Sequence, residues 1–295
     1  MPISYLSIVN EITAPLPPMP VARLGPPPLV PLAVPLEEAT ALIASSAGVH
    51  LRSDPPFASV DDLSCRRLAQ DVDPSEVRPS HPSPIRRPGR QDVNVVHPYH
   101  RLAELAEQKV IGSPSPFHLS MLGAIKQLTR IVTELGPAVV SAAGDAGADL
   151  ILVVPLCPAC HQAMGLLARV VERGGVPTVS VTGARDVTEM VRPPRAAYLD
   201  YPLGYSLGRP GDAAEQRVIV RDVLELAEAD LQPGAIVDLD HAWPDPGWEG
   251  QVLDRYRKEA DTVRSQRQKE FGPDGRHLAL EEVAAVEQMA ADGLL

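Results

Sequence analysis

The chain has 295 residues, and 27 lysines and arginines against 38 aspartates and glutamates give it a formal net charge of −11. Three cysteines are too few for the disulfide framework of a small secreted protein, and a hydrophobic fraction of 44% is too high for a disordered chain. An acidic chain repels nucleic-acid phosphates, so we expect no nucleic-acid partner. The 32 prolines are about twice the usual share.

The apolar stretches are too short or too interrupted to cross a membrane. Residues 149–161 fall short of the ~20 that a spanning helix needs, and five prolines interrupt the run at 24–36. The first apolar stretch carries Glu11 and has no basic segment before it, unlike a signal peptide. We therefore expect a cytoplasmic protein with no membrane partner, whose cysteines stay reduced unless redox chemistry is their function.

The pattern divides the chain into a Pro-rich arm (1–36), an α/β domain (37–235) and a helical C-terminal extension (236–295). Prolines break the arm so often that we expect an extended segment laid over a surface, either of this chain or of a neighbouring subunit in a homo-oligomer. A loosely ordered tail is the alternative. A short buried strand is expected near Thr40, in the sequence ALIASS, and a helix from Asp61 to Gln70.

Next come a loop rich in Pro, Arg and His, from Val77 to His100, and two segments with helical spacing of apolar residues. The first runs from Tyr99 to Lys109 and ends before Gly112, and the second runs from Leu122 to Leu135.

The strongest strand signal is DLILVVP, from Asp149 to Pro155, which is apolar without alternation. That pattern indicates burial on both faces, as in a parallel sheet. A helix from His161 to Arg173 and a strand from Val176 to Val181 follow it. This strand–helix–strand crossover predicts an α/β fold with a parallel sheet and flanking helices.

Beyond the crossover, the Pro- and Gly-rich run from Arg192 to Gly211 is expected to be irregular, and Asp212 to Ala229 to be a helix. Charged residues dominate from Trp248 to Glu270, which favours a solvated face or an oligomer contact. A last helix is expected from Leu278 to Ala291.

The main candidate for a catalytic motif is Cys157-Pro158-Ala159-Cys160, which lies between the strand with the strongest signal and the helix that follows it. The carboxyl ends of parallel strands form the crevice where ligands bind, and the helix N-terminus favours a thiolate. The spacing lets Cys160 attack a sulfur-linked intermediate on Cys157 and close a disulfide. This arrangement is typical of redox sites, with Cys157 as nucleophile and Cys160 as resolving thiol.

Three alternatives remain for these cysteines. They could be structural residues at a helix start, and with His161 they form the CxxCH string that attaches c-type haem in exported proteins. A zinc site needs further ligands, and neither Cys65 nor the other histidines form a second close-spaced pair, so we expect no metal. No Gly-rich phosphate fingerprint supports a bound nucleotide cofactor.

The segment LILVVPLCPACHQAMGLLARVVERGGVPTVSV resembles the active-site segment of selenoprotein B of glycine, sarcosine and betaine reductases, and of the related D-proline reductase subunit. Cys157 then occupies the selenocysteine position. Three other stretches fit cysteine-containing relatives of this family: Ala47 to Phe57, SHP with DVNVVHP between Ser80 and Pro98, and Pro193 to Gly211. The resemblance covers about residues 30–230.

The resemblance implies an oxidoreductase of the glycine/D-proline reductase type, which acts on X–H and Y–H to form an X–Y bond with a disulfide as acceptor. In the reductive direction such an enzyme cleaves a carbon–heteroatom bond of a small carboxylate-bearing substrate. It implies no bound cofactor but an external dithiol, such as thioredoxin, as electron donor. Membership of a multi-subunit reductase is also implied. Because cysteine replaces selenocysteine, we expect a substrate that is easier to reduce.

Further candidates for substrate binding surround the motif in the sequence. Arg86, Arg87 and Arg90 suit a carboxylate or phosphate, although each could instead pair with a surface acid. His81 and His97, each before a proline, could protonate a leaving group or simply pack. The remaining candidates are Asn94 as a donor to a carboxylate, His161 as a partner of the thiolate, and Gly204, whose backbone could approach the cysteines closely.

Two other functions remain open. A racemase or lyase would use Cys157 and Cys65 as opposed acid and base and would need no reductant. A non-catalytic or metal-binding subunit of a larger reductase complex would hold the same cysteines without turnover.

Overall fold

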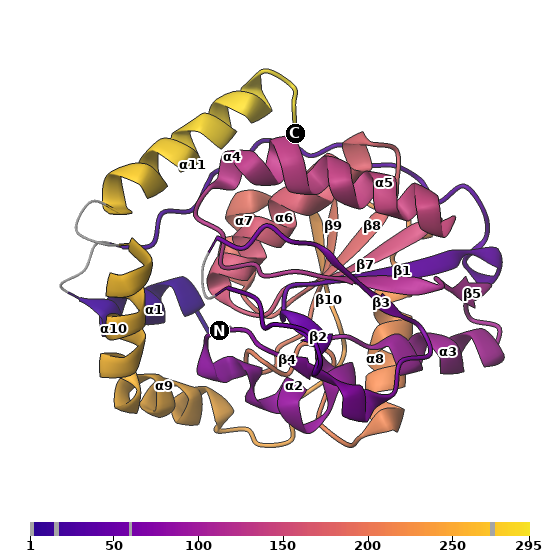
Figure 1. The fold of residues 1–295 in the computed structure, drawn as a ribbon, viewed down its shortest axis with the longest axis horizontal. Helices are drawn as coiled ribbons and strands as arrows, with labels where there is room; N and C mark the ends of the chain where they lie inside the picture. The colour runs from indigo at the N-terminus through magenta and orange to yellow at the C-terminus, as the bar shows by residue number, and fades with distance from the viewer. Residues whose placement is uncertain (1–2, 15–17, 59–60, 272–274) are drawn as a thin grey trace.

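The computed structural model describes residues 3–14, 18–58, 61–271 and 275–295, with side chains left aside at 266–271 and 275–278. Within these residues, one eight-stranded sheet forms the centre of the molecule (Figure 1). Its main path runs β10-β9-β8-β7-β1-β6-β3, and β5 also pairs with β1. The strands are β1 (Thr40–Ser45), β3 (Arg66–Ala69), β5 (Ser113–Pro114), β6 (Phe117–Ser120), β7 (Leu150–Val154), β8 (Thr178–Thr182), β9 (Arg195–Tyr198) and β10 (Ala235–Asp238).

Helices cover both faces of this sheet. The helices are α1 (Tyr5–Thr13), α2 (Arg87–Gln91), α3 (Tyr99–Glu107), α4 (Leu128–Arg130), α5 (Gly136–Ala146), α6 (Pro158–Arg173), α7 (Arg185–Val191), α8 (Ala213–Glu225), α9 (Trp248–Lys258), α10 (Ala260–Phe271) and α11 (Gly275–Ala291). A π-helical turn (Ile131–Leu135) joins α4 to α5, and short 3₁₀ turns lie at Leu36–Glu38, Pro74–Glu76, Pro84–Arg86 and Val93–Val95. In Figure 1, α4 to α7 lie on one side of the strands and α3 with α8 on the other.

The central strand β7 explains this layering. All five of its residues, LILVV, are buried, as expected for a parallel strand covered on both faces. Ile151 and Val153 join a hydrophobic cluster with residues of α6, whereas Leu150 and Leu152 join a second cluster with residues of α3 and α8. The prediction of an α/β fold with a parallel sheet and flanking helices is confirmed.

The chain reverses its direction of travel across the sheet between β1 and β7. These strands are parallel neighbours, in register from Ala41 opposite Leu150 to Ser45 opposite Val154. After β7 the chain crosses through α6 to β8, whereas the strands that follow β1 in sequence, β3, β5 and β6, lie on the other side of β1. Ligand sites of open α/β sheets form at such switch points, beyond the carboxyl ends of the strands.

The expected helix from Asp61 to Gln70 is wrong, because this segment contains the edge strand β3. Arg66 to Ala69 pair antiparallel with β6, and Leu68 buries its side chain while its neighbours remain outside the core. Pairing with a buried strand outweighs local helix propensity here, as tertiary context often does.

The arm differs from the extended segment that its prolines predict, because it begins with a helix. In α1, the Ser4 hydroxyl caps the helix by accepting a hydrogen bond from the Ser7 amide at 3.2 Å. Beyond the helix, residues 18–35 are extended and lie over the chain's own core, where Val21 and Leu24 are buried. The arm thus covers a surface of this chain, and a contact with another subunit stays a prediction.

The run from Arg192 to Gly211 is not irregular throughout, because it contains β9. The strand begins directly after Pro193 and Pro194, where a missing amide proton disturbs no pairing, and its four residues are all buried. Sequence patterns also missed α5 and β10, whereas α3, α6, β8, α8 and α11 lie close to their expected positions.

The C-terminal segment consists of α9, α10 and α11, and residues from it and from the arm join the core of the sheet domain. Trp248 and Val286 belong to the same hydrophobic cluster as Tyr5 and Val153. The three-part division of the chain stays a prediction. A search of the described helices found none long and apolar enough to span a membrane.

Candidate active site

The cysteine pair lies at the switch point of the sheet. Cys157 follows β7 by three residues and is the N-cap of α6, while Cys160 lies in the first turn of that helix. Pro158 occupies the first helical position, where a missing amide proton leaves no gap. The sequence thus forms the strand–turn–helix that was expected around the motif, with the helix starting at Pro158.

The two sulfurs are close enough to act as one unit. Their Sγ atoms are 2.8 Å apart, and the amide of Cys160 donates a hydrogen bond to the Cys157 Sγ at 3.2 Å. Cys157 is 8% exposed, whereas Cys160 is fully buried. Because two thiolates at this distance would repel each other, the pair holds at most one negative charge near neutral pH.

His81 completes the site from a distant part of the chain. Its Nε2 lies 3.3 Å from the Cys160 Sγ, and its Nδ1 accepts a hydrogen bond from the Ser83 amide at 3.1 Å. Because Nδ1 is an acceptor, we assign the ring proton to Nε2, which then donates to the sulfur. Of the two His-Pro histidines in the loop, His81 is the one beside the cysteines.

These contacts favour the thiolate of Cys160. Burial alone would raise the pKa of Cys160, but a hydrogen bond with Cys157, the electrostatic attraction of His81, and hydrogen bonds with His81 and Ser46 hold this pKa well below its usual value. The sequence predicts a stabilised thiolate at Cys157, and the structure shows that Cys160 also has groups around it that stabilise its thiolate.

His161 positions the backbone of the turn. Its Nδ1 donates to the Cys157 carbonyl at 2.7 Å, and its Nε2 accepts from the amides of Gly183 and Ala184 at 3.2 and 3.3 Å. Burial lowers the pKa of His161, so the ring is neutral in this environment. The ring therefore ties the start of α6 to the turn after β8, and neither nitrogen faces a sulfur.

The three candidate arginines point in different directions. Arg86 turns inward, and its Nη1 donates to the carbonyls of His81, Pro82 and Ser83 at 3.0, 2.5 and 3.0 Å. Arg86 thus holds the turn that carries His81. Arg87 pairs with Glu259 at 3.1 Å, and Arg90 lies near the carbonyl of Pro79 at 3.4 Å.

Asn94 and His97 are buried within the loop. Among the described residues, the Asn94 side chain has hydrogen-bond partners, whereas the His97 ring has none. The Asn94 side chain donates to Asp92 and accepts from the amide of His100. Neither ring nitrogen of His97 has a hydrogen-bond partner in the described part of the chain, and burial lowers the pKa of His97 to about 3. Substrate-binding roles for both residues stay predictions without a contact to the cysteines that supports them.

Gly204 makes a close backbone approach, but to the loop rather than to the cysteines. Its φ is +99°, and a Cβ on it would lie 2.3 Å from the carbonyl oxygen of Ile85. Only glycine fits there. Gly204 therefore lets the segment after β9 pack against the turn that follows His81.

Cys65 lies outside the pair. It directly precedes β3, which is three strands away from β7, or about 14 Å across the sheet. Burial raises the pKa of Cys65 to about 11, so this thiol stays protonated at neutral pH. An arrangement of Cys65 and Cys157 on opposite sides of one substrate carbon finds no support in this geometry.

Three contributors were missed by sequence reasoning. Ser46 follows β1 and hydrogen-bonds Cys160, as well as accepting from the Leu156 amide at 3.0 Å. Gly123 packs so tightly that a Cβ on it would lie 2.7 Å from the Cys160 Sγ. Tyr256 of α9 lies within electrostatic reach of Cys157; after burial, this interaction is the largest cause that raises the pKa of Tyr256. Only Ser46 had a signal in the sequence, because it follows a buried strand.

A cavity of about 270 Å³ lies beside the turn that follows His81. Ser83 and Ile85 line one wall, and Tyr205 and Tyr256 line others. Arg255 and the ion pair of Arg87 with Glu259 also line it, so Arg255 offers a cationic group within a space large enough for a small molecule.

The three buried side chains also form a donor set for a soft metal ion. The ligand atoms of His81, Cys157 and Cys160 all lie within 4.8 Å of one another. Two sulfurs and one imidazole suit Zn²⁺ and would leave one coordination position open.

Comparison with known proteins shows a distant sequence similarity to a reductase subunit. The chain is 25% identical, over 234 residues, to the D-proline reductase subunit gamma of Acetoanaerobium sticklandii. This match covers 79% of the chain and 94% of the relative. The chain is a distant relative of the proline and glycine reductase family. No family model matches the chain, and no solved structure matches it.

The relationship to this reductase family agrees with the resemblance seen in the sequence. The relative is named as a subunit of D-proline reductase, so the more specific likeness to selenoprotein B of the glycine, sarcosine and betaine reductases stays a prediction.

Proposed function

We propose that the chain is a thiol-dependent reductase subunit that cleaves a carbon–heteroatom bond of a small, carboxylate-bearing substrate. The observation that carries this proposal is the cysteine pair at the switch point, with Sγ atoms 2.8 Å apart and His81 at 3.3 Å from the inner sulfur. The distant relationship to D-proline reductase supports reductive chemistry over the other functions that the motif allows.

The reaction balances with the two thiols as reductant. The carbon–heteroatom bond of the substrate breaks, and the substrate gains two electrons from the two sulfurs. Cys157 and Cys160 are oxidised to a disulfide. The two thiol protons end on the carbon and on the heteroatom. An external dithiol, thioredoxin or a small molecule, then reduces the disulfide by thiol–disulfide exchange.

Cys157 is the better candidate for the attacking sulfur. It is the more exposed of the pair, and as N-cap of α6 it accepts the amide hydrogen bond of Cys160 and faces the positive end of the helix dipole. Cys160 is fully buried, with its sulfur beside His81 and 2.8 Å from the Cys157 sulfur. It therefore suits the resolving step, in which its thiolate displaces the reduced product from Cys157.

The cavity beside the His81 turn is the proposed substrate space. Arg255 lines it and would bind a carboxylate, Arg87 lines it while paired with Glu259, and Tyr256 lies near Cys157. A substrate held there would be bounded by α9, so the C-terminal extension would contribute to the site.

The relative's name, a subunit, supports an assembly. We propose that this chain works within a multi-subunit reductase, as a cytoplasmic protein and in more than one copy. Size-exclusion chromatography with light scattering on the purified complex tests the copy number, and mass spectrometry of its components tests the assembly.

Trapping on Cys157 is the direct test of the chemistry. A Cys160→Ser variant, incubated with candidate amino acids and other small carboxylates that carry a carbon–nitrogen bond, should accumulate a covalent adduct on Cys157 that intact-protein mass spectrometry detects. The wild type should show a Cys157–Cys160 disulfide after turnover without added dithiol.

Cys65→Ser is the matched control, because it removes a thiol outside the pair. This variant should retain activity, whereas Cys157→Ser should lose turnover completely. Full activity of Cys157→Ser would refute the proposed mechanism.

A further inference from the structure

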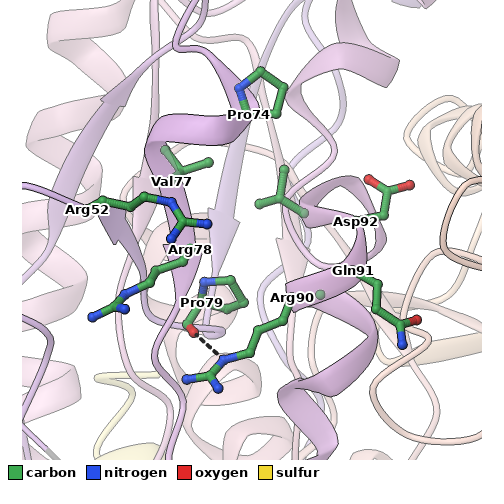
Figure 2. Close-up of a pocket in the computed structure, with 10 residues that line it drawn as sticks. Arg52, Pro74, Val77, Arg78, Pro79, Arg90, Gln91 and Asp92 are labelled. Carbon is green, nitrogen blue, oxygen red and sulfur yellow. Dashed lines mark hydrogen bonds between the residues drawn. The ribbon is translucent and has the colours of Figure 1, made fainter.

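A second hollow lies away from the cysteines, between a small two-stranded sheet and α2 (Figure 2). This small sheet pairs β2 (Val49–Leu51) with β4 (Val77–Pro79) in antiparallel register. The hollow has a volume of about 350 Å³, within the range of small-molecule sites. Neither cysteine nor His81 lines it.

Three arginines line this hollow. Figure 2 shows Arg52 and Arg78 on the side of the small sheet and Arg90 on the side of α2. The Nε of Arg52 donates to the Ser75 carbonyl at 2.6 Å, which fixes the direction of this side chain. The three arginines are exposed and line one concave surface, although the chain as a whole carries a net charge of −11.

No carboxylate of the described residues forms an ion pair with these arginines. Many arginines of the chain pair with an acid within 4.0 Å, yet none of the ion pairs among the described residues involves Arg52, Arg78 or Arg90. Asp92 is the one acid in the lining, and its carboxylate already accepts from Gly211 and Gln216. Like charges that converge without a counterion repel one another, and an anion would relieve this repulsion.

We propose that this hollow binds an oxyanion group, phosphate or carboxylate, of a small molecule. Arginine forks match both groups in bidentate geometry, and an anion there would bridge the small β2/β4 sheet and α2. β4 leads through Ser80 to His81, so the bound anion would also brace the segment that carries the histidine of the cysteine site. The site does not depend on the proposed function.

Calorimetric titration with inorganic phosphate, and separately with malonate, tests the proposal at constant ionic strength without any turnover. The two probes distinguish a phosphate from a carboxylate site. Arg78→Gln and Arg90→Gln should each weaken binding of the preferred probe about tenfold or more, since each loses a charge-assisted hydrogen bond. Arg90→Lys should weaken it less, because it keeps the charge but loses the fork.

Arg23→Gln is the matched control. Arg23 is exposed, lies on the arm, and makes no ion pair within the described ranges, so its replacement removes the same charge from the chain. Its affinity for the probe should equal that of the wild type. The proposal would be overturned if Arg78→Gln and Arg90→Gln each bound the probe as tightly as Arg23→Gln does. It would also be overturned if neither probe bound the wild type saturably.

Discussion

Replacement of His81 by leucine should raise the pKa of the Cys160 thiol. In the structure, the His81 Nε2 lies 3.3 Å from the Cys160 Sγ and points its proton at it, since Nδ1 is occupied by the Ser83 amide. Leucine offers no donor to the thiolate. The charged form of Cys160 therefore loses stabilisation, while its neutral form is little affected.

The magnitude follows from the type of hydrogen bond. A hydrogen bond to a charged group contributes ~1.5–3 kcal/mol, and 1.36 kcal/mol corresponds to one pKa unit. His81→Leu should thus raise the pKa of Cys160 by about one to two units. His81→Gln, whose amide can still donate, should give a smaller increase.

The thiolate's ultraviolet absorbance, followed across pH in a Cys157→Ser background, measures this change without requiring access to the buried sulfur. Cys65, with its pKa of about 11, titrates in a separate range. His241→Gln serves as control, because His241 contacts Asp222 rather than a cysteine. If His81→Leu leaves the titration of Cys160 where it was, the hydrogen bond does not stabilise the thiolate and the assigned ring proton is wrong.

Three further predictions concern packing, metal binding and acid stability. Gly123→Ala should destabilise the fold by about 1–3 kcal/mol and slow disulfide formation, because its Cβ would lie 2.7 Å from the Cys160 Sγ. Urea unfolding measures the loss of stability. The control Gly144→Ala, with open space around the new Cβ, should not be destabilised. Zn²⁺ should bind the reduced protein in a 1:1 ratio and block alkylation of Cys157 until a chelator removes it, and unchanged alkylation at saturating Zn²⁺ would contradict this. In the folded protein His97 has a pKa of about 3. Below pH ~6.5 the unfolded chain therefore binds a proton at His97 that the folded chain does not. The free energy of unfolding should thus fall as the pH drops from ~6.5 towards 3. His97→Leu should flatten this fall by up to about 1.4 kcal/mol per pH unit in urea titrations, and an unchanged slope would show that His97 is protonated in the folded state.

The crossover that carries the cysteines could be predicted because its signals are local. An apolar run without alternation predicts burial on both faces, and the spacing of Met164, Leu167 and Val171 predicts the helix after it; the structure places all three in one cluster above the sheet. Edge elements gave weaker signals. β3 is held by pairing with β6 alone, and a half-buried segment of four residues has no pattern long enough to distinguish it from a helix.

The sequence could not distinguish His81 from His97, because both precede a proline in the same loop. Long-range pairing separates them. β4 pairs with β2, and the His81 amide then donates to the Ala47 carbonyl at 3.1 Å, which brings the ring to the carboxyl end of β1. His97 instead follows a 3₁₀ turn that is tied to Ser45 through the Val96 carbonyl, and its buried ring has no hydrogen-bond partner among the described residues.

In the arginine-rich loop, the sequence likewise could not show which arginines are free to bind an anion. The sequence reveals a positive segment in an acidic chain, but whether a guanidinium is available depends on groups far away in the sequence. Arg87 is paired with Glu259, which lies 172 positions later. Arg86 donates hydrogen bonds to three carbonyls of its own turn. Arg90 forms no ion pair with an acid among the described residues, and it lines the same hollow as Arg78. An anion site can therefore form only where the fold brings arginines together and keeps carboxylates away, and this second condition leaves no trace in a local pattern.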